Sequence, residues 1–172
     1  MQENLAERLT EIMKKYHVAP AQINLEITGT AAAHSDMLEN NIKILHKQGI
    51  EFSLDDYGSG YSNTDYLFRF PFRIVKIDKN ILWEAFKNEK AMIALRNTIR
   101  MIKELGLEIV VEGVENQEYV DYLTEQHCDY LQGYFYSKPI PDRDFLELLR
   151  RENAQYYAER FSKNELSDII TT

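Results

Sequence analysis

Two adjacent carboxylates, Asp55 and Asp56, stand where an alternating apolar pattern gives way to a loop with two glycines, Gly58 and Gly60. Residues 50–54 alternate between apolar and polar side chains, a period-two pattern that predicts a β-strand. Neighbouring strand residues point to opposite faces, so one of the two carboxylates faces a buried environment unless the strand curls. A buried carboxylate needs a metal ion, a basic side chain or water to compensate its charge. The alternative interpretation is an ordinary Asp/Gly/Ser turn at a strand end.

The same kind of residue recurs at the ends of other predicted strands. Five successive strands carry polar or acidic residues at or near their carboxyl ends: Glu26, then Asp55 and Asp56, then Lys76 and Asp78, then Glu112 and Glu115, then Gln132. A single such residue is typical of a helix cap or a solvated turn. In a closed β/α barrel, however, all these ends meet on one rim. The set therefore predicts an acidic site that contains one lysine.

Such a site is suited to hard cations. Carboxylates that share a rim repel one another unless cations neutralise them, and oxygen ligands favour Mg²⁺, Mn²⁺ or Ca²⁺. Two such ions bridged by one aspartate would polarise a phosphate and generate a nucleophilic hydroxide. Lys76 could orient the water or stabilise charge on the phosphoryl oxygens. The pattern predicts metal-assisted phosphodiester hydrolysis.

The elements that must position these residues alternate along the chain. The predicted helices cover residues 5–16, 37–48, 81–105 with a break near Asn88, 119–126, and the charged tail from Asp142; the predicted strands cover 22–28, 50–56, 72–77, 107–111 and 129–134. Residues 30–33 are expected to form a loop of small residues, and residues 67–70 a short apolar segment before Pro71. Alternation of strand and helix predicts an α/β fold with a parallel sheet.

Composition narrows the class of protein. The chain has 172 residues, which fits one domain, and a net charge of −8 with its 20 lysines and arginines scattered. No basic stripe suggests nucleic acid or direct contact with a membrane surface. The single cysteine, Cys128, precludes an internal disulfide and fits a reducing cytoplasm. We expect a cytoplasmic protein, or the cytoplasmic part of a larger membrane-bound or multidomain protein.

Other reactive residues are less informative. The four histidines show no ligand spacing with one another, and Cys128 is best interpreted as a small residue buried before a strand. Four tyrosines could stack on a purine base, although tyrosines are also ordinary in a core or on a rim: Tyr61, Tyr66, Tyr134 and Tyr136.

The acidic stretches, taken together, resemble the EAL domain, the cyclic di-GMP phosphodiesterase module of bacterial second-messenger signalling. The matching segments are LEIT (25–28), LDDYGSGYS (54–62), VKID (75–78), VEGVE (111–115) and LQGYFYSKP (131–139), in the family's order and spacing. The resemblance covers residues 1–150, which we assign to the C-terminal portion of an EAL-like barrel, followed by a helical tail over 151–172. It implies a partial TIM-like (β/α) barrel with about five of eight strands present and the N-terminal strands missing.

The resemblance also implies roles for individual residues. It identifies Glu26, Asp55, Asp56 and Glu112 as metal ligands for two Mg²⁺ or Mn²⁺ ions, with Asp55 as their bridge. It implies that Lys76 holds the attacking water, that Gln132 lies near the metal ions, and that Glu115 supports the active-site loop. Residues of that loop or of the substrate contacts would be Tyr57, Gly58, Ser59, Gly60, Tyr61, Ser62, Asp78 and Pro139. The product in the family is the linear dinucleotide pGpG.

Two departures from the family pattern affect the expected activity. The chain contains neither the Glu-Ala-Leu motif, whose glutamate is a metal ligand, nor the asparagine ligand of the following strand. It also has Gly29 where the family commonly has a glutamate that steadies the active-site loop. We therefore expect little or no hydrolysis by the chain as it stands.

Three hypotheses about function remain open. The first is a cyclic di-GMP phosphodiesterase domain that retains most of its metal site. The second is a non-catalytic EAL-like module that binds cyclic di-GMP or a protein partner in signalling. The third is a barrel hydrolase that acts on another phosphoester. A partial barrel has two unpaired strand edges, so we also expect self-association as a dimer, through these edges or through the active-site loop.

Overall fold

The computed structural model describes residues 5–32, 36–60 and 64–160, and these form two compact units that divide after Tyr136. The first unit contains the helices α1 (Leu5–Tyr16), α2 (Gly29–Ala32), α3 (Asp36–Lys47), α4 (Tyr66–Arg69), α5 (Lys79–Ala85), α6 (Glu89–Glu104) and α7 (Gln117–Glu125), the 3₁₀ turn η1 (Pro20–Gln22), and the strands β1 (Asn24–Thr28), β2 (Glu51–Tyr57), β3 (Ile74–Ile77), β4 (Glu108–Val111) and β5 (Tyr130–Leu131). The second unit contains α8 (Asp142–Arg160). The boundary expected at residue 150 stays a prediction.

The five strands form one parallel sheet in the order β1-β2-β3-β4-β5. Each strand pairs with the next one along the chain, so every carboxyl end lies at the same edge of the sheet. The predicted α/β fold with a parallel sheet is confirmed, as is the partial barrel, because a run of parallel strands with successive helical crossovers is the repeating unit of a β/α barrel.

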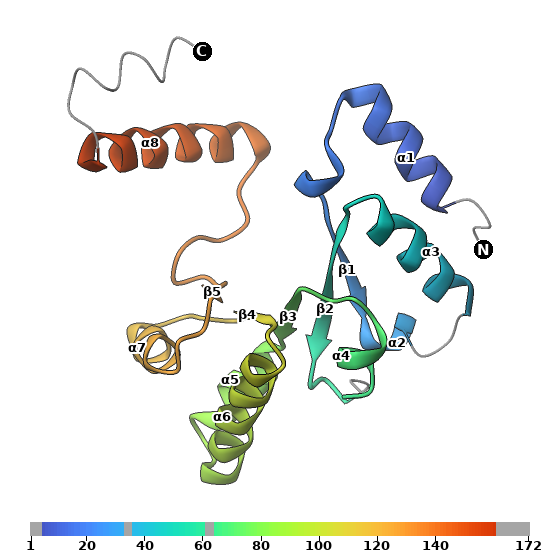
Figure 1. Cartoon of the computed structure of the whole chain (residues 1–172). Coiled ribbons are helices and arrows are strands. Elements are labelled where there is room, and N and C mark those ends of the chain that lie inside the picture. Colours follow the sequence, from blue (N-terminus) through green and yellow to red (C-terminus); the bar gives the residue numbers. More distant parts are fainter. Residues whose placement is uncertain (1–4, 33–35, 61–63, 161–172) are drawn as a thin grey trace. The chain divides into compact units, whose positions relative to one another are not determined.

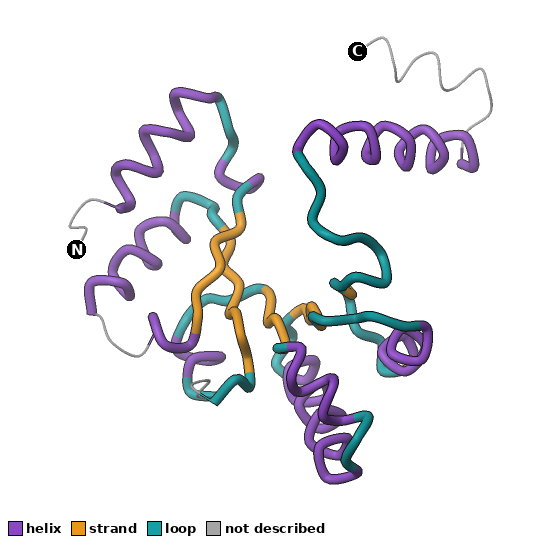
Figure 2. Tube along the Cα trace, turned by 180° about the vertical axis from the view of Figure 1, so that it is seen from behind, coloured by secondary structure: helices purple, strands orange, loops and turns teal. Residues whose placement is uncertain are grey.

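Helices cover only one face of this sheet among the described residues of the first unit. In Figure 1, α1 and α3 lie beside β1 and β2, and α5 and α6 lie beside β3; Figure 2 shows the same arrangement from behind. Strand residues that point to the helices, such as Val75, Ile77 and Ile109, are completely buried, whereas Ile74 and Val110 on the other face are only partly buried. The opposite face, which carries the acidic residues, is thus the accessible one.

The core lies between the sheet and its helices. Its largest fully buried side chains include Phe52 and Leu54 from β2, Leu82 from α5, Leu95 and Ile99 from α6, and Ile109 from β4. Burial of each such side chain stabilises the fold by about 1.5–3 kcal/mol relative to exposure. The core therefore fixes the orientation of β2, β3 and β4, the strands that supply most of the acidic site.

Polar caps begin the helices that follow the acidic strands. Asp78 caps α5 by accepting a hydrogen bond from the backbone N–H of Asn80 at 2.8 Å, and Asn88 and Asn116 cap α6 and α7 in the same way. The predicted break near Asn88 is confirmed, because α5 ends at Ala85 and Asn88 caps the start of α6. Gly106 follows α6 with a φ of +74°, a conformation that favours glycine.

Several predicted boundaries were wrong. The expected loop of small residues over 30–33 is instead the helical turn α2, in which the Thr28 hydroxyl accepts a hydrogen bond from the Ala31 N–H, with residue 33 outside the described ranges. The apolar segment before Pro71 is the helical turn α4. The first strand begins at Asn24 because Pro20 starts a 3₁₀ turn, and β5 contains two residues only. These short turns depend on local capping that hydrophobic periodicity does not reveal.

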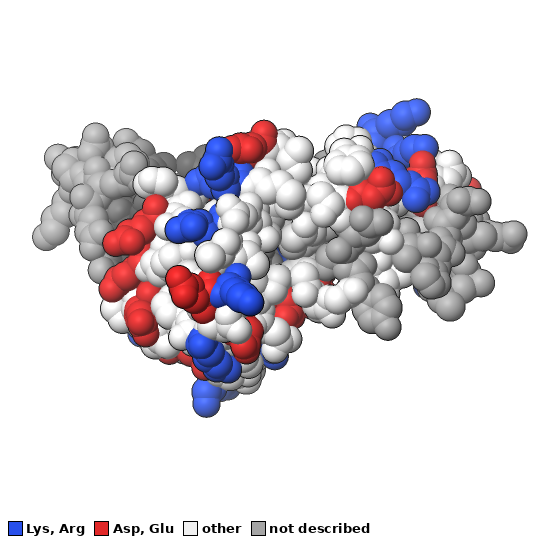
Figure 3. Space-filling model, turned by 90° about the horizontal axis from the view of Figure 1, so that it is seen from below, with Lys and Arg blue, Asp and Glu red and all other residues white. Residues whose placement is uncertain are grey.

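Charged side chains of both signs lie next to one another on the end of the first unit where α5 and α6 are found (Figure 3). Some of them pair within a helix, as Arg100 Nε does with Glu104 Oε1 at 2.8 Å. In the described part of the chain, no helix is long and apolar enough to cross a membrane.

Candidate functional site

The carboxyl ends of β1 to β4 bring three carboxylates around one ammonium group. Lys76 Nζ lies 2.8 Å from Glu112 Oε1, 3.0 Å from Glu26 Oε1 and 3.1 Å from Asp55 Oδ1. The four residues come from four adjacent strands and project from the uncovered face of the sheet. We call this set, together with Asp56, the acidic cluster.

Lys76 is the buried centre of this cluster. Its side chain is only 9% exposed, whereas that of Glu26 is 51% exposed and those of Asp55 and Glu112 are about 20% exposed. Burial by itself lowers the pKa of Lys76, but the contacts with Glu112, Glu26 and Asp55 outweigh it and raise the pKa above its ordinary value. The lysine is therefore cationic at neutral pH and cannot serve as a general base.

The strand β2 changes direction at its carboxyl end, and this brings Asp56 to the same side as Asp55. Asp56 has a φ of +54°, and the pairing of β2 with β3 shifts register between Leu54 and Tyr57. One oxygen from each of Asp55, Asp56 and Glu112 lies within 4.8 Å of the others. A regular strand would have placed the two aspartates on opposite faces, so the irregular backbone is what makes both available to one ligand.

The electrostatics of the cluster favour a divalent cation. Burial, followed by the charges of Asp55 and Asp78, raises the pKa of Asp56. Four carboxylates against one ammonium leave three negative charges uncompensated when all are ionised. In the described residues, Asp55 Oδ1 is buried and contacts Lys76 Nζ at 3.1 Å, and a carboxylate oxygen with one such partner can still bind a cation. An all-oxygen donor set of this kind fits Mg²⁺ or Mn²⁺.

A second part of the site adjoins Glu112. A cavity of about 230 Å³ is lined by Lys79 and Trp83 from α5, Glu112 and Glu115 from the segment after β4, and Gln132 and Tyr134 from the segment after β5. The structure therefore brings Gln132 and Glu115 beside Glu112, although Glu115 is exposed and makes none of the ion pairs around Lys76.

The remaining residues that were predicted to act are less directly placed. Asp78 is buried and caps α5, and its charge reaches the cluster through its effect on Asp56. Tyr57 is buried, with its hydroxyl 3.5 Å from that of Thr64, and Gly58, Ser59 and Gly60 form the exposed turn that follows. Tyr61 and Ser62 lie outside the described residues. Pro139 belongs to the second unit, so its proposed substrate contact stays a prediction.

Trp83 and Lys79 were missed by the sequence reasoning. Trp83 is the single tryptophan of the chain, which is a compositional signal, but its position on a helix that follows Asp78 gave no indication that it reaches the segment after β4. Only the packing of α5 against that segment places it there.

A second ionic group lies at the opposite, amino end of the strands. It consists of one arginine and two carboxylates, so it carries less excess negative charge than the acidic cluster. Arg73 binds Glu51 through one guanidinium nitrogen and Glu108 through two others at 3.0 and 3.2 Å. Glu51 and Glu108 stand at the starts of β2 and β4, on either side of β3. The fork of Arg73 thus joins three strands, a stabilising role that needs no ligand.

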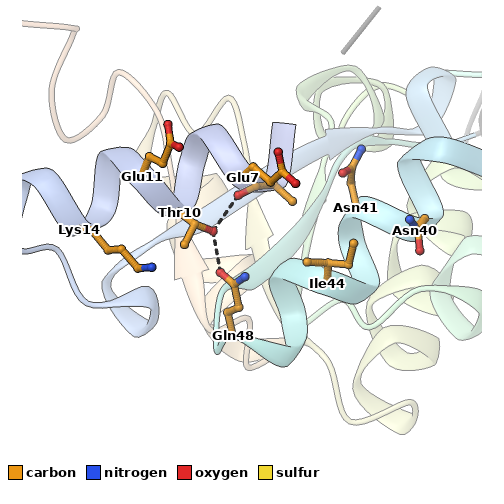
Figure 4. A pocket seen from close by; sticks show the side chains of 9 residues that line it. Glu7, Thr10, Glu11, Lys14, Asn40, Asn41, Ile44 and Gln48 are labelled. Atoms are coloured by element: carbon orange, nitrogen blue, oxygen red, sulfur yellow. Dashed lines mark hydrogen bonds between the residues drawn. The ribbon is translucent and has the colours of Figure 1, made fainter. Parts of the chain in front are cut away.

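The groove between α1 and α3 shows no convergence of reactive groups. Thr10 donates a hydrogen bond to Ala6 O and lies 2.9 Å from Gln48 Oε1, while Glu7, Glu11 and Lys14 line the walls of this groove of about 400 Å³ (Figure 4). The contact between Thr10 and Gln48 links α1 to the residue that follows α3. This groove is not a candidate for the chemistry predicted from the sequence.

Comparison with known proteins identifies relatives of this arrangement. The family model of the EAL domain matches residues 1–139. The cyclic di-GMP phosphodiesterase RocR of Pseudomonas aeruginosa is 32% identical over 145 residues, which are 83% of this chain and 37% of that protein. The chain spans between about a fifth and about two fifths of the length of the first curated relatives that it matches.

Solved structures show the same fold. The EAL domain of DcpA from Mycobacterium smegmatis superposes with a TM-score of 0.80 at 28% identity, over 88% of this chain and 68% of that one. BlrP1 of Klebsiella pneumoniae, solved as a complex with manganese and cyclic di-GMP, gives a TM-score of 0.73 at 25% identity, over 80% of this chain and 36% of that one.

Proposed function

Because the chain belongs to the EAL domain family, we propose that it acts in the metal-assisted hydrolysis of cyclic di-GMP. The observation that carries the proposal is the acidic cluster: Glu26, Asp55 and Glu112 around Lys76, with Asp56 beside them. RocR is a cyclic di-GMP phosphodiesterase, and BlrP1 binds cyclic di-GMP together with manganese. These relatives support cyclic di-GMP as the ligand of this chain.

The metal would be held by the carboxylates of the cluster. Asp55, Asp56 and Glu112 supply oxygens close enough to share an ion, and Glu26 adds a fourth carboxylate 3.0 Å from Lys76 Nζ. The buried Asp55 Oδ1, whose contact in the described structure is the Lys76 ammonium, can accept a second partner, and this supports Asp55 as the shared ligand. When bound, Mg²⁺ or Mn²⁺ would polarise the phosphate and lower the pKa of a water molecule.

The chain's own residues would orient the reacting groups. Lys76, being protonated, would donate hydrogen bonds to the attacking water or to a phosphoryl oxygen, where developing negative charge is stabilised by the fixed cation. Gln132 would assist from the other side of Glu112. Water adds across one phosphorus–oxygen ester bond, leaving a phosphate on one ribose and a hydroxyl on the other, and the cyclic substrate becomes linear pGpG.

Supporting roles follow from position. Asp78 would fix the start of α5, and Glu115 would support the segments around the site. Tyr57 and the turn Gly58–Ser59–Gly60, continuing to Tyr61 and Ser62, would form the active-site loop, with φ values of +95° and +104° at the two glycines allowing its sharp path. Pro139 would contact the substrate.

The second candidate function is binding without catalysis. It is favoured by the Lys76 ammonium, which already pairs with three carboxylates and so offsets part of the charge that cations would otherwise neutralise. Gly29, which stands where the family commonly has a glutamate, also favours this second function. In this case the chain would bind cyclic di-GMP or a signalling partner and release no product.

The test is a paired measurement of binding and turnover with cyclic di-GMP and Mn²⁺. We expect metal-dependent binding, with weak hydrolysis to pGpG, and loss of both in Asp55→Asn, because an amide removes one negative charge and an ionic ligand. Asp121→Asn, an exposed carboxylate on α7, is the matched control. Binding without any product selects the second function, and binding that ignores both Mn²⁺ and Asp55→Asn contradicts the first.

We also propose that two copies of the chain associate through strand edges. In the described structure, β1 and β5 each pair with one neighbour only, so their outer backbone groups are open to another strand. The active-site loop is the alternative contact.

A location in the cytoplasm is proposed from the single Cys128, a free thiol, and from the second-messenger ligand.

A further inference from the structure

The single tryptophan of the chain ties α5 to the segment that carries Glu112. The indole N–H of Trp83 donates a hydrogen bond of 2.8 Å to the carbonyl oxygen of Gly113, thirty residues further along the chain. The bond is partly buried, and the ammonium of Lys79 lies over the indole ring, 5.4 Å from its centroid. Trp83 is therefore held by its own helix while it holds the backbone next to Glu112.

The backbone at Gly113 is shaped for this contact. Gly113 has a φ of +72°, and a Cβ built there would lie 2.3 Å from Lys79 Cβ and 3.0 Å from Trp83 Nε1. A residue with a side chain would thus both strain the backbone and displace it from α5. The close approach of α5 to this segment depends on glycine at this position.

The segment from Glu112 to Val114 is anchored on its other sides as well. The Glu112 N–H donates to Ile77 O at 3.1 Å, and the Val114 N–H donates to Gln132 O at 3.1 Å. Gly133 passes so close that a Cβ there would lie 2.0 Å from Val114 O. Strand β3 and the segment after β5 therefore fix the two ends of this stretch, and Trp83 fixes the carbonyl between them.

The position of the Glu112 carboxylate is what these anchors determine. Its Oε1 lies 2.8 Å from Lys76 Nζ, and one of its oxygens is close to those of Asp55 and Asp56. Without the indole N–H, the carbonyl of Gly113 would lose its partner from α5, and the adjoining peptide could rotate. A change of a few tenths of an ångström is enough to weaken a metal site, because ligand geometry is narrow for Mg²⁺ and Mn²⁺.

We propose that Trp83 is a positioning residue for the metal site: its indole N–H fixes the Gly113 carbonyl and thereby places the Glu112 carboxylate against Asp55 and Asp56. The inference rests on the proposed metal-dependent function. In this role Trp83 contacts neither substrate nor metal, and its replacement should lower the affinity of the chain for the cation.

The test compares Mn²⁺ binding by the full chain and by Trp83→Phe, measured from the electron paramagnetic resonance signal of free Mn²⁺. Phenylalanine retains an aromatic ring under Lys79 but has no N–H donor. We expect the dissociation constant for Mn²⁺ to rise about tenfold, the lower end of the range for residues that orient metal ligands from outside. An unchanged constant overturns the proposal.

A matched variant separates positioning from loss of stability. Phe86 stands at the end of the same helix and packs on Tyr119, with ring centroids 4.5 Å apart, and it is not among the residues that contact Gly113 most closely, Lys79 and Trp83. Phe86→Leu should lower the midpoint of thermal unfolding and leave the Mn²⁺ affinity unchanged. If both variants lose affinity in proportion to their unfolding midpoints, Trp83 is only structural and the proposal is overturned.

A measurement on the unaltered chain keeps the proposal testable if Trp83→Phe does not fold. One tryptophan gives one indole N–H signal in a ¹H–¹⁵N spectrum. We expect this signal to be slow to exchange with solvent and to shift when diamagnetic Mg²⁺ is added, because the Gly113 carbonyl responds to ligation of Glu112. If Mg²⁺ binds and the indole N–H signal of Trp83 does not shift, the proposed link between Trp83 and Glu112 is refuted. If neither ion binds the unaltered chain, the metal-dependent function itself has failed.

Discussion

Replacement of Lys76 by methionine tests the central arrangement of charges. Methionine retains the length of the side chain and removes its positive charge, so Glu26, Asp55 and Glu112 lose the cation that lies 2.8–3.1 Å from each of them. At an effective dielectric constant of about 20, each such pair attracts by about 5–6 kcal/mol before the cost of burying the charges is subtracted. The net loss is smaller than the sum, since that burial cost is large.

Removal of one partner from a buried ion pair costs about 3–5 kcal/mol, and the half-exposed Glu26 places this case at the lower end. We expect Lys76→Met to lose about 3 kcal/mol of unfolding free energy at about pH 7, which corresponds to a fall in the thermal midpoint of roughly 6–12 °C for a chain of this size. Lys90→Met, at an exposed site on α6, should change stability by less than about 0.5 kcal/mol.

The pH dependence of this loss has a definite sign. In the unaltered chain the pKa of Lys76 is raised, so its contribution is fully present below the pKa of an unfolded lysine and is lost only as alkaline pH rises through the folded value. The charge of Lys76 lowers the otherwise raised pKa of Asp56, so in Lys76→Met that pKa should rise further and the folded state should bind a proton more readily. The stability deficit should therefore shrink as the pH falls toward about 5.

Urea unfolding at about pH 7 and about pH 5, with and without Mn²⁺, measures the unfolding free energies of Lys76→Met and the unaltered chain. Mn²⁺ should stabilise Lys76→Met more than the unaltered chain, because the cation takes over the neutralising role of the ammonium. Equal stability of Lys76→Met and the unaltered chain at neutral pH would refute the reasoning, since it would mean that the three carboxylates do not depend on Lys76. A deficit that grows on acidification would do the same.

Two further predictions concern the thiol and the strand edges. Cys128 is partly buried rather than fully buried as the sequence predicted, and this burial raises the pKa of its thiol to about 12, so the thiol is protonated at neutral pH. We expect it to react with a disulfide reagent far more slowly in the folded chain than in denaturant, and equal rates would contradict this shielding. If β1 and β5 pair with a second copy, light scattering should give the mass of a dimer that dissociates on dilution, and a monomer at all concentrations would exclude association through these edges.

Much of the fold could be predicted from the sequence because the signals are local. The alternating pattern before Asp55, the apolar residues at helical spacing in α1 and α6, and the polar residue at Asn88 each predict an element or its boundary without knowledge of the rest of the chain. The short turns α2 and α4 were missed, because a single turn has no hydrophobic period and depends on one or two capping bonds.

The choice of site residues was also largely a sequence result. Parallel strands place their carboxyl ends at one edge, so acidic residues at the ends of successive strands were expected to meet, and Glu26, Asp55 and Glu112 do meet around Lys76. The metal ligation and catalytic roles of these residues remain predictions, as do those of Gln132, Glu115 and the loop from Tyr57 to Ser62.

Three features were decided by the tertiary structure alone. The left-handed backbone at Asp56 turns two consecutive aspartates toward one point, which strict alternation of side chains along a strand would forbid. The three carboxylates gathered around the buried Lys76 keep it protonated, although burial alone would favour the neutral amine. The contact between Trp83 and Gly113 joins residues thirty positions apart. Sequence periodicity fixes which way a side chain points from its own element, but the distance between side chains on different elements is set by how those elements pack, and no local pattern encodes it.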